Sequence, residues 1–272
     1  MTKNLDNDGL RSIVENYDIF YIDLWGVVHN GITLHKNAIE ALEEITKVKK
    51  KYVLLTNAPR PKTTVRAILE KMGMSKEMSD KVYSSGEASL SYLKKYYSNK
   101  KFYHIGPSRD FDLFVDFKEN KTVDIKESHY LLCTGLFEEQ GKDLNYYKDL
   151  FKEHINKKMI CTNPDLIVER GSKRELCAGS VALVFEKIGG EVVYFGKPFP
   201  EVYKQAINNE GKRVLSIGDN LNTDIKGANL LNYNSLIISN GIHKDEIKKE
   251  GIDVVSKKYE VVVNFIQTEL KW

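Results

Sequence analysis

A short run of apolar residues that ends in an aspartate constrains the fold of this chain more than any other feature. Within residues 17–31, YDIFYIDLWGVVHNG, the run at 19–22 consists of β-branched and aromatic residues. It is too short for an ordinary helix and predicts a buried strand. Asp23 follows directly, and in open parallel α/β sheets ligands bind beyond the carboxyl ends of the strands. A carboxylate there can be a nucleophile, a metal ligand or the cap of a following helix.

Strands and amphipathic helices alternate in the first and last thirds of the chain. Apolar residues at three- and four-residue spacing predict helices, and short apolar runs predict strands. The predicted strands are residues 52–55, 214–217 and 235–238, with a last short one at 252–255, and the predicted helices are residues 38–48, 65–72, 202–207 and 223–231. Because such alternation is typical of parallel sheets, we predict an α/β fold with a doubly wound, Rossmann-like parallel-sheet core.

The middle of the chain has strands and helices of its own. The predicted strands are residues 102–105, 130–133 and 159–161, the predicted helices are residues 90–97, 144–155 and 181–188, and the polar run 118–128 is predicted to be a surface connection. We therefore predict two domains. Residues 1–84 and 195–272 form the core, and residues 85–194 form an inserted α/β cap that covers the strand ends.

Composition excludes several classes of partner. The 272 residues are 42% hydrophobic and 29% charged, as in an ordinary globular protein, and a net charge of +3 is too small to indicate a nucleic-acid surface. The polar N-terminus has no apolar signal core, and no apolar run approaches the roughly 20 residues that cross a bilayer. Cys133, Cys161 and Cys177 lack the spacing of a metal site or disulfide framework. We predict a cytoplasmic protein without nucleic-acid or membrane partners.

Four polar features follow strands or lie in loops, and together they supply what phosphoryl transfer needs. They are Asp23, the pair Thr56 and Asn57, Lys197 in GKPFPE, and Asp219 with Asp224 in GDNLNTD. A carboxylate can attack phosphorus, a hydroxyl and an amide can bind phosphoryl oxygens, a lysine adds positive charge, and further carboxylates can hold magnesium.

Each feature also has a purely structural explanation. Asp219 and Asp224 can cap the helix that follows them, and Lys197 can be a surface lysine before a helix-starting proline. Thr56 and Asn57 suit any turn. We favour a shared site, because all of these explanations would have to hold at once, in this order along the chain.

In this order, and with the stretch CTNPD at 161–165, the motifs resemble the haloacid dehalogenase (HAD) superfamily, most closely its class IIA branch. That branch includes pyridoxal phosphate, phosphoglycolate and nitrophenyl phosphate phosphatases. The resemblance covers nearly the whole chain. It implies a HAD core with a C2-type cap, a Mg²⁺ cofactor, a small phosphorylated metabolite as substrate, and a homodimer formed through the caps.

The resemblance also implies roles for single residues. Asp23 would be the nucleophile that becomes an aspartyl phosphate, steadied by Lys197. The phosphate ligands would be Thr56, Asn57 and Lys197. The metal ligands would be Asp23, the backbone carbonyl of Trp25, Asp219 and Asp224, although Asp224 can instead pair with Lys197. From the cap, Asn163 and Asp165 would contact the substrate.

Trp25 departs from the family pattern, in which this position holds a second aspartate, the general acid and base. Indole has one weak N–H donor and cannot exchange a proton near neutral pH. General acid–base catalysis contributes about 10²–10⁴-fold to the rate, so without it the hydrolysis of esters with poor leaving groups should slow most. His29 has a suitable pKa and could point into the cleft as a substitute, but we favour its placement in a surface loop. For the Trp25 side chain, packing is the default expectation.

We therefore predict a Mg²⁺-dependent phosphatase with an altered proton-transfer step and low activity. One alternative is a catalytically weak relative that binds a phosphorylated metabolite as a sensor or partner protein. Another is a phosphotransferase or a phosphonate-cleaving enzyme. A dinucleotide-binding dehydrogenase is disfavoured, because no predicted strand leads into GxGxxG.

Overall fold

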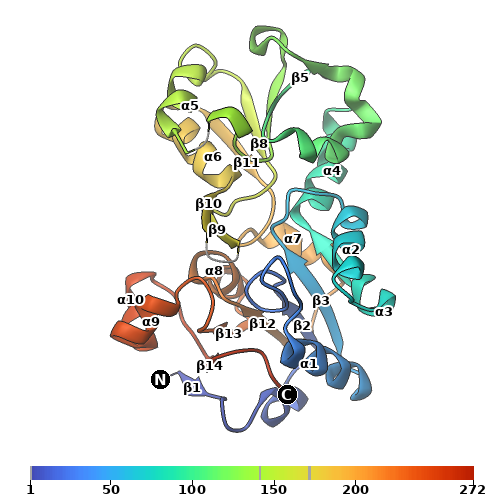
Figure 1. Ribbon diagram of the computed structural model, residues 1–272, viewed down its shortest axis with the longest axis vertical. Helices are drawn as coiled ribbons and strands as arrows, with labels where there is room; N and C mark the ends of the chain where they lie inside the picture. The colour runs from blue at the N-terminus through green and yellow to red at the C-terminus, as the bar shows by residue number, and fades with distance from the viewer. Residues whose placement is uncertain (1, 141, 171–172) are drawn as a thin grey trace.

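The computed structural model describes residues 2–140, 142–170 and 173–272. It contains a seven-stranded parallel sheet, a five-stranded parallel sheet and a two-stranded antiparallel hairpin. In Figure 1 the seven-stranded sheet lies in the lower half of the molecule and the five-stranded sheet in the upper half. The hairpin reaches down from the upper half toward the lower one.

The seven-stranded sheet has the order β1-β14-β13-β12-β2-β3-β4. Its strands are β1 (Lys3–Asn4), β2 (Ile19–Ile22), β3 (Lys51–Thr56), β4 (Val82–Ser84), β12 (Val214–Gly218), β13 (Asn234–Ile238) and β14 (Phe265–Gln267). In register, Ile22 lies between Leu54 of β3 and Ile217 of β12. The chain order reverses on the two sides of β2, and open α/β sheets bind ligands at such a switch point.

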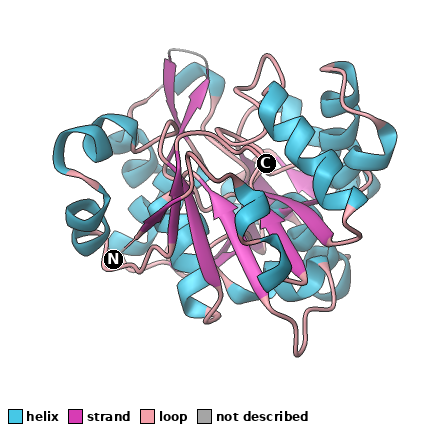
Figure 2. Cartoon of the chain, turned by 90° about the horizontal axis from the view of Figure 1, so that it is seen from below, coloured by secondary structure: helices cyan, strands magenta, loops and turns pink. Residues whose placement is uncertain are grey.

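Side chains of β2 alternate between two apolar clusters. Phe20 and Ile22 pack in a cluster with residues of α1 and α2, whereas Ile19 and Tyr21 pack in a second cluster with residues of α4 and α7. Helices therefore cover both faces of the sheet, as Figure 2 shows, and the doubly wound α/β prediction is confirmed. The helices around this sheet are α1 (Lys36–Lys47), α2 (Lys62–Lys71), α3 (Lys76–Ser79), α4 (Ser85–Tyr96), α7 (Pro200–Ala206), α8 (Lys226–Leu230), α9 (Lys244–Glu250) and α10 (Ile252–Lys258).

The five-stranded sheet has the order β11-β8-β7-β5-β6 and is built from the middle of the chain. Its elements are β5 (Phe102–Ile105), β6 (Lys121–Thr122), β7 (Tyr130–Cys133), β8 (Lys158–Cys161), β11 (Glu191–Tyr194), α5 (Leu144–Phe151) and α6 (Ala178–Lys187), with the hairpin β9 (Ile167–Arg170) and β10 (Lys173–Leu176). The cluster around Tyr21 continues into this half through Phe102 and Tyr130. We propose that this half is the predicted cap, residues 85–194. The boundaries of the cap stay a prediction.

Several sequence-based expectations are wrong in detail. Residues 252–255 are not a strand but the start of α10: Gly251 precedes the helix, and Ile252, Val255 and Tyr259 pack on one side of it, while Val254 is 49% exposed. The predicted surface connection 118–128 contains β6. The helix predicted to reach residue 155 ends at Phe151, where the His154 N–H bonds to the Phe151 carbonyl and tightens the chain into a turn.

The strands that the sequence did not indicate are short or polar, namely β1, β4, β6, β9, β10, β11 and β14. Among the described residues, no helix combines the length and apolar character that a membrane span requires.

Candidate active site

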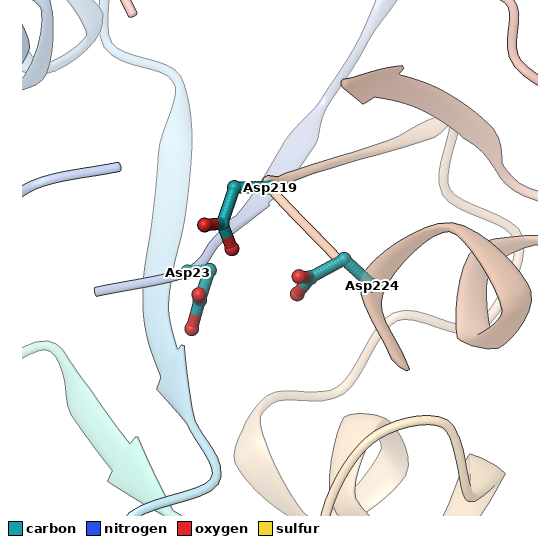
Figure 3. Close-up of side chains that lie close together, drawn as sticks. All are labelled: Asp23, Asp219 and Asp224. Atoms are coloured by element: carbon teal, nitrogen blue, oxygen red, sulfur yellow. The ribbon is translucent and has the colours of Figure 1, made fainter. Parts of the chain in front are cut away.

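Three carboxylates meet at the carboxyl ends of β2 and β12. Asp23 directly follows β2, Asp219 directly follows β12, and Asp224 lies in the helical turn Leu221–Ile225 that comes next. One oxygen atom from each side chain lies within 4.8 Å of the other two. Figure 3 shows the three side chains gathered around one space. Residues separated by about 200 positions in the chain therefore form a single acidic cluster.

Backbone contacts position these carboxylates. The Asp23 N–H donates to the Ile217 carbonyl (2.8 Å), which fixes the end of β2 against β12. Asp219 Oδ2 accepts a hydrogen bond from the Ile242 N–H (3.0 Å), and Asp224 Oδ2 accepts one from the Asn220 N–H (3.2 Å). Gly26 has a φ of +80°, and a Cβ there would lie 2.2 Å from Asp219 Oδ2, so only glycine lets the loop after β2 pass this close.

Lys197 is the cation of the cluster. Its Nζ lies 2.5 Å from Asp23 Oδ1 and 2.7 Å from Asp224 Oδ1, and the residue is only 3% exposed. Asp224 pairs with Lys197, one of the two alternatives that the sequence offered, and it also lies in the carboxylate cluster; its role as a metal ligand stays a prediction. A buried lysine needs such partners, because an unpaired charge in the interior is strongly unfavourable.

Asn57 holds Lys197 in place. Its Oδ1 accepts from the Lys197 backbone N–H (2.7 Å), and its Nδ2 donates to the Lys197 carbonyl (3.0 Å) and to Asp165 Oδ1 (2.9 Å). The sequence did not indicate this positioning role, since no motif links the two residues. Thr56 ends β3, and its Oγ1 accepts from the Ala58 N–H (3.2 Å). The predicted contacts of Thr56 and Asn57 with a phosphate stay predictions.

Three carboxylates face one ammonium group, so the cluster carries excess negative charge. Burial raises the pKa of Asp219 well above its usual value, and the charges of Asp23 and Asp224 raise it further. Burial also raises the pKa of Asp224 to about 6, against the opposing effect of Lys197. Burial acts to lower the pKa of Lys197, but Asp224 and Asp23 outweigh it and the pKa is raised. Carboxylate oxygens with uncompensated charge suit a hard divalent cation.

One cavity opens at this cluster, and a second cavity adjoins the first. The first, of about 440 Å³, is lined by Asp23, Asp219, Lys197 and Thr56 among others. The second, of about 660 Å³, has a largely apolar wall from α2 and the cap, which includes Val65, Ile68, Leu69, Met72, Leu136 and Phe137. Trp25, Thr56, Asn57, Asp165 and Val168 line both cavities and so mark the junction between them.

Trp25 and His29 pack together in the loop after β2. Their rings lie 5.1 Å apart and edge to face, and a Cβ at Gly31 would lie 2.6 Å from the Trp25 ring. His29 is buried, so its placement in a surface loop was wrong. Its Nδ1 accepts from the Gly31 N–H (2.9 Å), and burial lowers the pKa of His29 to about 4. His29 lines the second cavity, but with this lowered pKa its imidazole is neutral near pH 7, so it is not favoured as the substitute acid.

The cap residues Asn163 and Asp165 differ in the cavities that they line: Asp165 lines both, and Asn163 lines one. Asn163 Oδ1 accepts from the Asp165 backbone N–H (2.9 Å) and orients the loop, and Asn163 lines only the second cavity. Asp165 reaches the core through its bond with Asn57. Sequence reasoning missed His35 and Lys244, which line the first cavity from positions that carry no recognisable motif.

Two known protein families match separate parts of the chain. The family described as haloacid dehalogenase-like hydrolase matches residues 20–117, and the family described as HAD-hydrolase-like matches residues 194–265. A hydrolase of the haloacid dehalogenase-like family from Brucella suis 1330 has a solved structure similar to this one. Its TM-score is 0.78, it is 31% identical, and the match covers 86% of this chain and 90% of that chain.

Two curated relatives have comparable lengths. Phosphoglycolate phosphatase 2 from Arabidopsis thaliana is 23% identical over 88% of each chain. Dihydroxyacetone phosphatase from Corynebacterium glutamicum (strain R) is 25% identical over 85% of this chain and 84% of that one. Together with the parallel sheet, the cap and the order of the motifs, these matches establish that the chain belongs to the haloacid dehalogenase-like hydrolases, in the class IIA branch.

Proposed function

We propose that this protein is a Mg²⁺-dependent phosphatase that acts on a small phosphorylated metabolite through an aspartyl-phosphate intermediate. The observation that carries the proposal is the convergence of Asp23, Asp219 and Asp224 around one space, with Lys197 joining two of them. The phosphatase activities named for the two curated relatives support the same reaction class.

Asp23 is the proposed nucleophile. Lys197 binds Asp23 Oδ1, so we assign the attack on phosphorus to the other carboxylate oxygen. A bond forms between this oxygen and phosphorus as the ester P–O bond breaks, and the leaving group departs with the electron pair. A water molecule then attacks the phosphorus, which returns Asp23 as a carboxylate and releases inorganic phosphate.

Asp23, Asp219, Asp224 and the backbone carbonyl of Trp25 are the proposed ligands of Mg²⁺. When bound, the ion would neutralise the excess negative charge of the cluster and stabilise charge on the phosphoryl group. Lys197 adds a fixed positive charge beside the nucleophile.

Metal binding can be tested without measuring activity. Mg²⁺ at 100 times its dissociation constant should stabilise the folded protein by about 2.7 kcal/mol and raise Tm by several degrees. Asp219→Asn should abolish most of this shift. Without metal, the same substitution should raise Tm at neutral pH, because the raised pKa of Asp219 means that the folded protein disfavours the charged form that the unfolded chain adopts.

Asp149→Asn serves as the control for the metal experiment, since Asp149 is an exposed aspartate on α5 that lies in neither cavity. Thermal melts with and without Mg²⁺ give the readout. An equal Mg²⁺ shift in the wild type and in Asp219→Asn would remove Asp219 from the metal site.

Trp25 favours one second candidate function. Since indole cannot protonate a leaving group, turnover of alkyl phosphates should be slow, and a protein that binds a phosphorylated metabolite as a sensor would need no turnover at all. Hydrolysis of nitrophenyl phosphate with Mg²⁺ separates the two, because nitrophenolate leaves without protonation. Turnover supports the phosphatase. Tight binding of phosphate esters without turnover across a broad panel would favour the sensor.

The second cavity is the proposed site of the leaving group, and its apolar wall should favour an apolar body. Ile68 lines it and is 39% exposed. Ile68→Glu should lower kcat/KM for nitrophenyl phosphate by about 10-fold, since one apolar side chain in a pocket is worth roughly 1–3 kcal/mol. It should change kcat/KM for glycerol phosphate less. Steady-state kinetics on both substrates gives the ratio.

The matched control for Ile68 is Ile155→Glu. Ile155 is 43% exposed but lines neither of the two cavities. The control should leave both substrates unaffected. A similar loss on both substrates in Ile68→Glu would contradict a leaving-group role for the second cavity.

A further inference from the structure

The first cavity contains few groups that could replace the missing acid at Trp25, and of these His35 and Lys244 do not reach the second cavity. Its carboxyl side chains, among the described residues, belong to Asp23, Asp165 and Asp219. Asp23 and Asp219 are members of the acidic cluster and have roles there. Asp165 is the carboxyl group that lines the second cavity as well. It therefore lies at the junction, where the bond between a phosphoryl group in the first cavity and a leaving group in the second would break.

Asp165 is held from two sides. It belongs to the cap segment between β8 and β9, where Asn163 Oδ1 accepts its backbone N–H (2.9 Å). From the core, the Asn57 amide donates to its Oδ1 (2.9 Å). The second oxygen, Oδ2, takes no part in that bond. Since the same amide holds the backbone of Lys197, Asp165 has a fixed place relative to the lysine that contacts the nucleophile.

The charges around Asp165 favour a carboxyl group that gains and loses a proton near neutral pH. Burial raises its pKa to about 6; the Lys197 ammonium and the Asn57 hydrogen bond act against this, and the Asp224 carboxylate adds to it. Asp23 also faces it from the end of β2, and on the cap side its neighbours are the thiols of Cys161 and Cys177. A phosphate dianion bound beside it would add negative charge and so favour the protonated form.

We propose that Asp165 supplies the proton transfer that Trp25 cannot. This inference rests on the proposed phosphatase function. In the first step, the ester P–O bond breaks, its electron pair passes to the leaving oxygen, and that oxygen takes the proton from Asp165 Oδ2. In the second step, the oxygen of a water molecule bonds to phosphorus while the Asp165 carboxylate accepts a proton from that water. The P–O bond to Asp23 breaks at the same time. Asp165 is thereby protonated again.

The test compares leaving groups in Asp165→Asn, which keeps the shape of the side chain but cannot exchange a proton. Alkyl phosphates need protonation of the leaving oxygen, so their kcat/KM should fall by about 10²–10⁴-fold. With nitrophenyl phosphate, rapid-mixing measurements should show a burst of nitrophenolate followed by slowed turnover, because the first step is spared and hydrolysis of the aspartyl phosphate is not. The pH dependence of kcat/KM for alkyl esters should lose its basic limb.

A second variant separates this role from a purely structural one. Asp165→Asn combined with Trp25→Asp places a carboxyl group at the position where the family has its acid, and it should recover alkyl phosphate turnover; melts of both variants report folding. An equal fall for alkyl and nitrophenyl esters without a burst, or no recovery in the double variant, would overturn the role of Asp165. Absence of any nitrophenolate release by the wild type, in the burst or in the steady state, would instead overturn the proposed phosphatase function.

Discussion

Asp23→Asn is expected to eliminate phosphate-ester hydrolysis, with a loss of kcat on the order of 10⁴–10⁶-fold for nitrophenyl phosphate. An amide is a poor nucleophile, and the substitution also removes the oxygen anion that Lys197 Nζ contacts at 2.5 Å. Steady-state hydrolysis with Mg²⁺ and mass spectrometry of acid-quenched protein measure turnover and the phosphorylated aspartate. Neither product nor phosphorylated protein should accumulate in the variant.

The variant should still fold, because Lys197 keeps its contact with Asp224 at 2.7 Å. Asp18→Asn is the matched control: Asp18 precedes the opposite end of β2 and forms an exposed ion pair with Arg213. The control should keep full activity. Undiminished hydrolysis in Asp23→Asn, with a normal melt, would mean that another group attacks phosphorus.

The active-site cluster could be predicted from the sequence because each member directly follows a strand or belongs to a contiguous motif. The run before Asp23 is apolar at every position, and both faces of β2 are in fact covered. Parallel pairing then leaves little freedom, since strands in register end at the same edge. Hence the proximity of Asp23 and Asp219 could be predicted, although they lie far apart in the chain.

Features that depend on tertiary contacts could not be predicted in the same way. Residues 252–255 contain β-branched residues that suit a strand, but packing of Val255 against Ile237 and Ile247 selects a helix. The short sequences IVER of β9 and KREL of β10 are half or more charged and give only a weak apolar signal, although this hairpin contributes Val168 to the junction of the two cavities. His29 is buried where its ring packs against the ring of Trp25. No local sequence pattern indicates this packing.

The role of Asn57 shows the same limit at a single residue. Its position after a strand suggested a phosphate contact, yet the structure engages its amide with Lys197 and Asp165. These partners are 140 and 108 positions away along the chain. Only the meeting of cap and core creates the arrangement. The leaving-group cavity arises from the same meeting of α2 with the cap, and its shape was therefore beyond the reach of motifs.

In the Asp165→Asn background, Trp25→Asp is expected to increase turnover of alkyl phosphates by about 10²-fold, as part of the roughly 10²–10⁴-fold that general acid–base catalysis supplies. Trp25 lines both cavities, so an aspartate there would face the junction where the leaving group departs. The nearby acidic cluster should raise the pKa of the new carboxyl group, which suits a proton donor. The measurement is kcat/KM for alkyl and nitrophenyl esters. The gain in kcat/KM should be smaller for the nitrophenyl ester, because nitrophenolate leaves without protonation in the first step.

Trp25→Asn is the control, because it removes the same indole without adding a group that exchanges protons. Both variants lose the contact of the Trp25 ring with Gly31 and His29, and we expect each to be destabilised by about 1–3 kcal/mol, less than a fully buried tryptophan would cost. Kinetics should therefore be measured well below Tm. If Trp25→Asn gained as much activity as Trp25→Asp, steric relief by removal of the indole would explain the gain. If neither variant gained, a carboxyl group at position 25 would not serve the leaving oxygen, and the loss in Asp165→Asn would have to be explained without proton transfer.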